Sequence, residues 1–379
     1  MKNNRYLNPF YSDLISEIIR HGGMYNAHLH LDRANTLDDK YMQSSRHHIL
    51  ENSYISLHKK HSLINSLHAG PAYEKDDFRS RVNATLDVMI ASNTKRADTM
   101  VDVTADNIGT KAIQMLEEIK KEREQDIDLH LAAYSPFGFT DAEPQRWEKF
   151  IEGVEFSDFI GALPEADDTD EYPDHIGFEE HCKRMLMLAK QYNKVLHVHT
   201  DQRNEPSENG TERLIEVVKS YGAPVSASGE PMVWAVHMIS PSTYEDERFE
   251  QLARDLVECN IGVICCPSAA IGMRQIRPIT TPTYNSIPRV LELLREGVHV
   301  RLASDNIADI CSPSTTADLI DEVYMLSAAI RFYHVGILAK LAAGVSLDTN
   351  DIKTIDEHLE KNKQEMNKIM ADYSKRIRT

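Results

Sequence analysis

Short apolar runs alternate with amphipathic stretches along most of this chain. Between the runs, apolar residues recur at helical spacing, as at Leu214, Ile215 and Val218 ahead of a glycine at position 222. Strands separated by helices pair in parallel through right-handed crossovers. Eight such units predict a (β/α)₈ barrel of the TIM type, with a doubly wound open sheet as the alternative. The expected strands are Met24–Leu31, Thr99–Ala105, Asp128–Tyr134, Phe159–Pro164, Val195–Thr200, Val233–Met238, Gly262–Pro267 and Val298–Ser304.

Two parts of the chain fall outside this regular spacing. The long gap between the first two strands carries helical patterns around 40–67 and 76–92, which we read as helical insertions. After the last strand, the pattern predicts one helix from Thr315 to Ala343 and a mostly polar helix over 351–376. We therefore expect one domain over 1–379, with the barrel core at 22–343.

The polar C-terminal helix carries an apolar stripe along one side. This stripe either caps the barrel or meets another subunit, so a homo-oligomer is one of two expectations. Its members are Ile355, Leu359, Met366, Ile369 and Tyr373.

The composition of the chain indicates which classes of partner and which cellular compartment to expect. The chain has 379 residues and a formal net charge of −17, which argues against nucleic acid and anionic membranes as partners. Its longest apolar runs are too short to span a bilayer, and no signal-peptide core follows the residues Met1–Arg5. The five cysteines show no regular spacing. We expect a cytoplasmic protein that acts on a small molecule.

The first predicted strand carries two histidines inside an apolar segment. The segment from Asn26 to Asp32 reads Asn-Ala-His-Leu-His-Leu-Asp. In a strand, residues two apart project to the same face, so His28 and His30 aim at one point. A bound metal ion is the functional interpretation, and a surface strand with two histidines is the alternative.

Other strand ends supply further ligand-type residues. In such barrels, side chains at the carboxyl ends of the strands converge on the active site. Imidazole and carboxylate groups around a divalent cation, with a position left for water, make a hydrolytic site. The residues at these ends are His197 and His199 on the fifth strand, His237 on the sixth and Asp305 after the eighth.

In this order, the segments resemble the amidohydrolase superfamily and, within it, the cytosine deaminase group. The resemblance covers the chain from about Gly22 to about Tyr333. It rests on the segment Asn26 to Asp32, on His-Val-His-Thr-Asp at 197–201, and on Ile-Gly-Val-Ile-Cys-Cys-Pro at 261–267. The fourth segment is Gly-Val-His-Val-Arg-Leu-Ala-Ser-Asp at 297–305.

The resemblance implies roles for these residues. His28, His30, His199 and Asp305 would bind one metal ion. Asp305 would double as general base, and His237 would polarise the metal-bound water or touch the substrate. In the family, the strand 5 ligand lies three residues before the proton-shuttling carboxylate. That spacing selects His199, and leaves His197 as a packed, hydrogen-bonded neighbour.

Position 202 departs from the family pattern. The family's deaminases carry a glutamate there that shuttles a proton, whereas this chain has Gln202. An amide can donate a hydrogen bond but cannot cycle a proton at neutral pH. Glu165 follows the fourth strand, and three interpretations are open for it. It could supply the acid that is missing at position 202, it could bridge two metal ions, or it could belong to the solvated acidic loop 165–171.

The expected substrate pocket also differs from that of the cytosine enzymes. The third strand ends with Tyr134 and Phe137, which offer a substrate contact or simple aromatic packing together with Phe139. Arg33 would bind an anionic substrate group at the barrel mouth or form an ion pair with Asp32 or Asp38. Many relatives also carry a small β-sandwich domain, for which the residues flanking the barrel leave little material.

These residues predict a metal-dependent hydrolase of an amidohydrolase type. Metal-bound hydroxide would attack a carbon–nitrogen bond of an amide, a cyclic amide or an amino-heterocycle. The alternatives are a binuclear esterase, lactonase or amidase bridged by Glu165, and a barrel that binds a ligand without turnover. The expected cofactor is one divalent ion, zinc first, with iron and manganese as alternatives.

Overall fold

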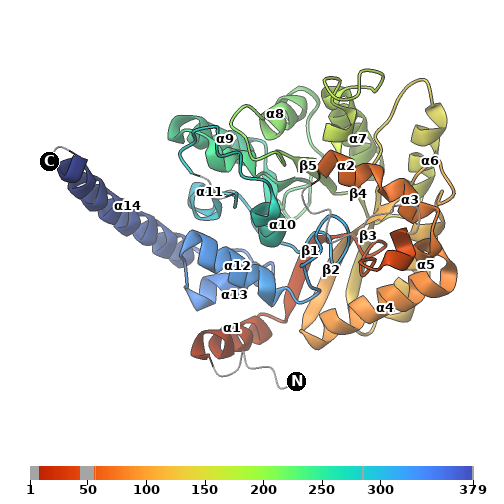
Figure 1. Cartoon of the computed structure of the whole chain (residues 1–379). Coiled ribbons are helices and arrows are strands. Elements are labelled where there is room, and N and C mark those ends of the chain that lie inside the picture. The colour runs from red at the N-terminus through yellow and green to blue at the C-terminus, as the bar shows by residue number, and fades with distance from the viewer. Residues whose placement is uncertain (1–7, 43–54, 56, 284–285, 378–379) are drawn as a thin grey trace.

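The computed structural model describes residues 8–42, 55, 57–283 and 286–377. Eight parallel strands form one sheet in the order β1-β2-β3-β4-β5-β6-β7-β8, and helices surround it (Figure 1). The strands are β1 (Met24–Leu29), β2 (Thr94–Asp102), β3 (Asp128–Tyr134), β4 (Phe159–Ala162), β5 (Leu196–Thr200), β6 (Val233–His237), β7 (Ile261–Cys265) and β8 (Val300–Leu302).

The last strand returns to the first. Beyond β8, Asp305 forms a parallel bridge with Leu29, and its backbone N–H donates to the carbonyl of His28 at 3.0 Å. The sheet is therefore a nearly closed barrel, as the alternation of apolar runs predicted, and the open-sheet alternative is wrong.

The outer helices follow the strands that precede them. They are α4 (Lys75–Ala91), α5 (Lys111–Glu122), α6 (Pro144–Glu155), α7 (Phe178–Tyr192), α8 (Gly210–Tyr221), α9 (Asp246–Glu258) and α11 (Val290–Glu296). Shorter elements cover the carboxyl ends of the strands: η2 (Asp39–Met42), α2 (Leu57–Ser62), α3 (Ile64–His68), η4 (Pro71–Tyr73), η5 (Pro164–Asp167), η6 (Ser240–Thr243) and α10 (Pro267–Gly272). The first helix, α1 (Pro9–Arg20), packs against α13 (Val335–Ala342).

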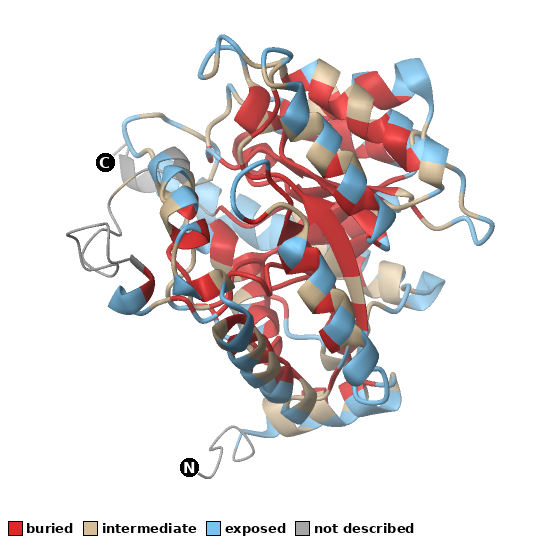
Figure 2. Cartoon of the chain, turned by 90° about the vertical axis from the view of Figure 1, so that its right-hand side faces the viewer, coloured by how far each residue is buried: buried red, intermediate tan, exposed pale blue. Residues whose placement is uncertain are grey.

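Apolar side chains fill both faces of the barrel wall. Buried strand residues and the inner faces of the helices form the larger cluster, and the strands run through the buried centre of the molecule (Figure 2). Inside the barrel, Trp234 and Val236 pair in register with His197 and His199, so these four side chains share the inner face. The guanidinium of Arg301 lies 3.9 Å from the Trp234 ring, below the histidines. The interior is thus packed and polar residues are held at its upper end.

Two expectations about element boundaries are wrong, and a third lies partly outside the residues that the structure describes. The predicted single helix from Thr315 to Ala343 is wrong: the chain forms α12 (Ile320–Ile330) and α13, separated by Arg331 with a φ of 55°. The second strand begins at Thr94 rather than Thr99, because Arg96 is accommodated by an ion pair with Asp98 at 3.0 Å. Of the helical pattern expected around 40–67, residues 43–54 and 56 lie outside the described residues.

The C-terminal helix α14 spans Thr349–Ile377, close to the predicted 351–376. Its first turns pack against the body near α11, and the rest projects away from the molecule (Figure 1). Among the described residues, no helix combines the length and apolarity needed to cross a membrane.

Candidate metal centre

Four histidines and one aspartate from four strand ends converge inside the top of the barrel. Ligand atoms of His28, His30 and His199 lie within 4.8 Å of one another, and so do those of His28, His237 and Asp305. All five residues are at most 6% exposed. The structure thus brings together the residues expected to bind metal and the histidine expected beside it.

Irregular backbone aims several of these side chains. The register between β1 and β2 shifts between Asn26 and Leu29, immediately around His28. His237 pairs with Thr200 in register but has a φ of 77°, which breaks the alternation at the end of β6. Asp305 has a φ of 61°. Left-handed backbone at residues other than glycine costs energy, and it concentrates at sites where it serves function.

The donor set fits a divalent metal ion. His199 directs its Nε2 inward, because its Nδ1 bonds the carbonyl of Ala162 at 2.9 Å. His28 is fully buried and neither ring nitrogen has a hydrogen-bond partner among the described residues. A buried imidazole without partners is costly unless something binds it. Three imidazoles with one carboxylate are typical zinc ligands, and iron and manganese accept the same donors.

The charge states of these groups suit metal binding. Burial, reinforced by the neighbouring histidines, lowers the pKa of His28 and of His199 well below the usual range, so both rings are neutral. Asp305 Oδ1 lies 3.4 Å from His30 Nε2 and 3.8 Å from His28 Nε2. Although burial opposes ionisation, His30 and His237 hold the pKa of Asp305 well below its usual range. Asp305 is therefore a carboxylate at neutral pH.

A second buried network supports His30 from outside. Arg33, which is 3% exposed, donates from Nη2 to His30 Nδ1, and its Nε lies 3.8 Å from Asp102 Oδ2. Asp102 in turn accepts from His68 Nε2 at 3.0 Å. Because a guanidinium only donates, its contact uses the Nδ1 lone pair, and the proton of a neutral His30 ring then lies on Nε2. A metal ligated through Nε2 would displace this proton.

Asp102, His68 and Asp32 were not among the predicted site residues. Asp102 ends β2, and a lone carboxylate after the apolar pair Met100 and Val101 is the signal that the sequence carries for it. Hydrogen bonds from His68 to Asp102 and Asp106 outweigh burial and raise the pKa of His68 to about 9. Asp32 accepts from the backbone N–H of Asp102 at 2.9 Å and from Tyr73 at 3.0 Å. The expected ion-pair partner of Arg33 was Asp32 or Asp38, whereas the ion pair found among the described residues is with Asp102.

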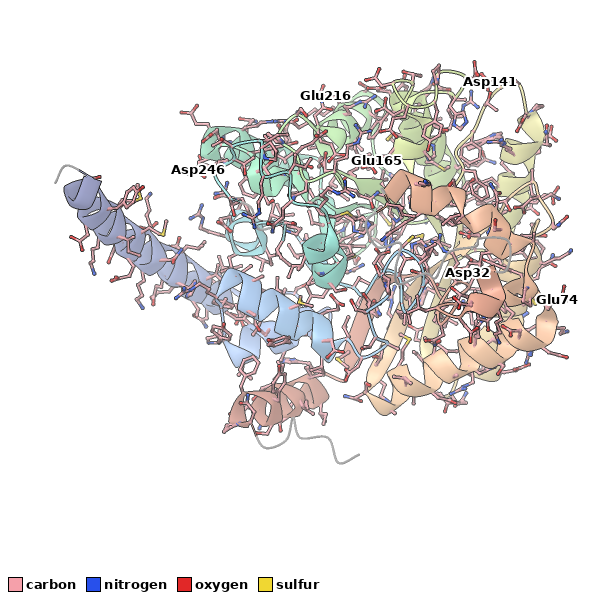
Figure 3. The ribbon with its side chains drawn as sticks, in the orientation of Figure 1. Asp32, Glu74, Asp141, Glu165, Glu216 and Asp246 are labelled. Carbon is pink, nitrogen blue, oxygen red and sulfur yellow. The ribbon has the colours of Figure 1, made fainter. Side chains whose placement is uncertain are left out.

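Glu165 and Gln202 meet at the mouth of the barrel. Gln202 Nε2 donates to Glu165 Oε2 at 2.7 Å, which ties η5 to the end of β5. Glu165 lies toward the interior in Figure 3, whereas Asp141, Glu216 and Asp246 lie at the periphery. Burial, with the nearby charge of Asp201, raises the pKa of Glu165 to about 7. Glu165 is half-buried and hydrogen-bonded, which favours a role at the site over a place in a solvated acidic loop.

The aromatic residues expected in the substrate pocket separate into two kinds. Tyr134 is buried, and its ring centroid lies 5.3 Å from those of both His30 and His199. Phe137 is half-buried and contacts the ring of His68 at 5.6 Å. Phe139 packs against Trp147 under the loop, with centroids 5.1 Å apart. Tyr134 and Phe137 therefore lie near the site, and Phe139 is packing.

His197 lies one layer below the candidate ligands. Its ring packs 4.6 Å from that of Phe159 and is fully buried. The expectation of packing is met, but the expected hydrogen bond is absent: neither ring nitrogen has a partner among the described residues.

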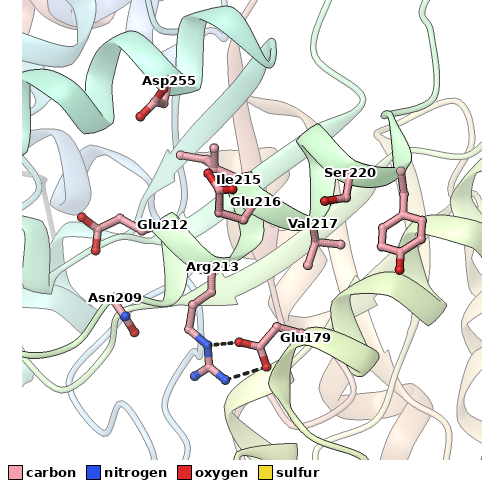
Figure 4. A pocket seen from close by; sticks show the side chains of 10 residues that line it. Glu179, Asn209, Glu212, Arg213, Ile215, Glu216, Val217, Ser220 and Asp255 are labelled. Carbon is pink, nitrogen blue, oxygen red and sulfur yellow. Dashed lines mark hydrogen bonds and ion pairs between the residues drawn. The ribbon is translucent and has the colours of Figure 1, made fainter.

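Two cavities differ in their relation to this site. One of about 490 Å³ opens over the ends of β2 to β4 and is lined by Ser135, Phe137 and the half-buried His61 of α2. Burial and the nearby Arg33 lower the pKa of His61 to about 3, and sequence reasoning gave no sign of this residue. The other, about 600 Å³, is an acidic groove among α7, α8 and α9 on the outside of the barrel, where Arg213 pairs with Glu179 (Figure 4). The first cavity lies at the carboxyl ends of the strands, and its lining residues Asp106 and Phe137 contact His68.

Comparison with known proteins locates this fold among hydrolases. The 5-methylcytosine deaminase of Klebsiella pneumoniae, liganded with phosphonocytosine, matches with a TM-score of 0.68 at 22% identity, over 82% of this chain and 70% of that chain. The N-isopropylammelide isopropylaminohydrolase of Burkholderia multivorans matches with a TM-score of 0.61 at 15% identity, over 89% and 82%. The barrel fold is the one these hydrolases share.

One relative was found by sequence comparison. An uncharacterized protein of Haemophilus influenzae is 28% identical over 295 residues, which are 77% of this chain and 97% of that protein. No family model matches the chain.

Proposed function

We propose that this protein is a metal-dependent hydrolase that cleaves a carbon–nitrogen bond, other than a peptide bond, in a small molecule. The observation that carries the proposal is the buried cluster in which His28, His30, His199 and Asp305 converge. A centre of this kind, at the carboxyl ends of barrel strands, is where such enzymes work. The similar deaminase and aminohydrolase folds support the reaction class.

The proposed ligands are His28, His30, His199 and Asp305. A divalent ion bound there lowers the pKa of its water from about 15.7 toward 7, and so supplies a nucleophile at neutral pH. Asp305, held ionised, would accept the proton of the attacking water. His237, whose pKa burial lowers, is a neutral ring that would donate a hydrogen bond to the substrate oxygen as charge develops there.

Glu165 would return a proton to the departing nitrogen. Its raised pKa of about 7 keeps a protonated fraction near neutral pH, as a general acid requires. Gln202 would orient this carboxyl through its amide, in place of carrying the proton itself. Glu165 belongs to none of the ligand clusters found among the described residues, which favours the acid over a bridge between two metals.

The substrate would enter over Phe137 and lie against Tyr134, with Arg33 beside the metal ligand His30. A flat amide, cyclic amide or amino-heterocycle suits a pocket with aromatic walls. Arg33 already contacts His30 and Asp102, so it would reach an anionic substrate group only by giving up one of these contacts.

Metal analysis tests the proposal. We expect about one equivalent of divalent metal per purified chain, and loss of that metal in His199→Ala, because one of four ligands is removed. The matched control is His130→Gln, at a half-buried histidine that pairs with Asp128 outside the centre. About two equivalents would favour the binuclear alternative. No metal in the wild type, and unchanged ligand binding in His199→Ala, would contradict a metal-dependent enzyme.

Gln202→Glu tests why this chain departs from the deaminase pattern. The new carboxyl would lie beside Glu165, where Gln202 Nε2 now donates over 2.7 Å, and the pair would share a proton. If the amide is what removes pyrimidine deamination, the variant should raise trace ammonia release from aminopyrimidines or aminotriazines. An unchanged rate would place the specificity in the pocket around Tyr134, Phe137 and Glu165.

A further inference from the structure

The helix α14 is anchored at one end only. Ile355 is fully buried, and the ring of His358 lies 5.0 Å from that of Phe332. Lys340 of α13 pairs with Asp351. These contacts fix the first turns of α14 to the body, and none of them involves a residue beyond Leu359.

The apolar stripe of α14 continues past this anchor without cover. Met366 is 51% exposed, Ile369 59%, Met370 53% and Tyr373 55%. Four of the fifteen exposed large apolar side chains in the described part of the chain thus lie within eight residues of one helix. Exposed apolar groups gathered in this way mark an interaction surface more often than scattered ones do.

The spacing of the stripe indicates what covers it. From Ile352 onward, the stripe steps by three and four residues in strict alternation, which is the heptad pattern of a coiled-coil seam. Such a seam is narrower than the face that a helix turns toward a globular core, and it fits a second helix. Its positions are Ile352, Ile355, Leu359, Asn362, Met366, Ile369 and Tyr373.

We propose that the projecting part of α14 pairs with α14 of a second copy of this chain. In a two-fold symmetric pair the same stripe of both copies meets, so each stripe provides the apolar cover for the other. Residues 360–374 carry three acidic and three basic side chains, so the paired segments meet no net repulsion although the whole chain carries −17. Asn362 is the polar member of the seam, and one polar layer of this kind fixes the register of two helices.

The projecting helix also needs a partner for its own stability. Eighteen residues of α14 extend beyond Leu359, and helices in proteins gain most of their stability from the packing of an apolar face. Ion pairs on the outer face, such as Lys368 with Glu365 at 2.5 Å, add only a few tenths of a kcal/mol each. Burial of Met366, Ile369 and Tyr373 in a seam would supply the missing stabilisation.

The size of the contact predicts a weak dimer. Eighteen helical residues extend about 27 Å, and a helix is about 10 Å wide, which gives a footprint of about 270 Å² on each copy. Standard stable interfaces bury about 800 Å² per partner. We therefore expect a concentration-dependent equilibrium with a dissociation constant in the micromolar range or above.

Sedimentation equilibrium of the full chain from about 1 to 200 µM tests this inference. The wild type should pass from its monomer mass of 43.1 kDa toward twice that mass. Ile369→Lys, which puts a charge in the seam, should raise the dissociation constant at least about tenfold. Gln364→Lys adds the same charge on the opposite face of α14 and should leave the equilibrium unchanged.

Cysteine crosslinking gives a second measurement that does not depend on the charge variants. Met366→Cys should form a disulfide-linked dimer on mild oxidation, whereas Gln364→Cys should not exceed the wild type. A wild type that stays monomeric over the whole range overturns the inference, and so does a dimer that Ile369→Lys leaves intact, since that dimer would use another surface. Neither outcome bears on the metal centre, which lies inside the barrel.

Discussion

Replacing Asp305 by asparagine should lower turnover by about 10²–10⁴-fold, the loss typical of a removed general base. The amide keeps the shape of the side chain but cannot accept the proton of the attacking water. It is also a weaker ligand than a carboxylate, so the metal content should fall as well. The rate would be measured on the best substrate from an ammonia-release screen over amino-heterocycles and cyclic amides.

Asp309→Asn is the matched control for this variant. Asp309 is also buried and lies four residues along the same loop, where its Oδ1 accepts from the backbone N–H groups of Cys311 at 2.8 Å and Ser312 at 2.9 Å. An amide oxygen keeps both bonds, so metal content and rate should stay near those of the wild type. If the turnover of Asp305→Asn stayed within tenfold of the wild-type turnover, Asp305 would not be the general base.

Glu165→Gln should lower turnover by a similar factor, about 10²–10⁴-fold, because the amide of the variant cannot give a proton to the departing nitrogen. The sign of the pH dependence follows from the acid role. With a pKa of about 7, Glu165 is protonated below neutral pH and loses its proton above it, so wild-type turnover should fall as pH rises through about 7. The residual activity of the variant should lack this descending limb.

Glu171→Gln is the control for Glu165→Gln. Glu171 is exposed on the same loop and pairs with Arg203 at 2.7 Å, outside the candidate centre. This control should keep both the rate and the pH profile of the wild type. A descending limb that persists in Glu165→Gln would assign the proton to another group.

The sequence predicted the barrel and the candidate ligands because both depend on local pattern. Each strand is a short apolar run, and the residues His28, His199 and Asp305 stand at strand ends, which a barrel brings together whatever the detailed packing. The break between α12 and α13 could not be predicted in this way. Arg331 adopts a left-handed conformation between apolar residues that continue the helical pattern on both sides.

The network around Arg33 escaped prediction for a different reason. Its partners Asp102 and His68 come from β2 and α3, and only the folded chain decides which of several nearby carboxylates an arginine meets. The contact between Gln202 and Glu165 is of the same kind, since it joins two strand ends that are 37 residues apart. Residue types at strand ends can be identified from sequence, whereas their pairing requires the structure.

The bridge between Leu29 and Asp305 lies where the first strand meets the last. His28 and Asp305 are separated by nearly the whole barrel in sequence, yet their side chains face each other across this junction. A metal ion bound by both residues would crosslink the two ends of a very long loop of chain, as a disulfide does. Closing a loop of this length lowers the conformational entropy of the unfolded chain. Loading with metal would then stabilise the junction at which a barrel most easily opens.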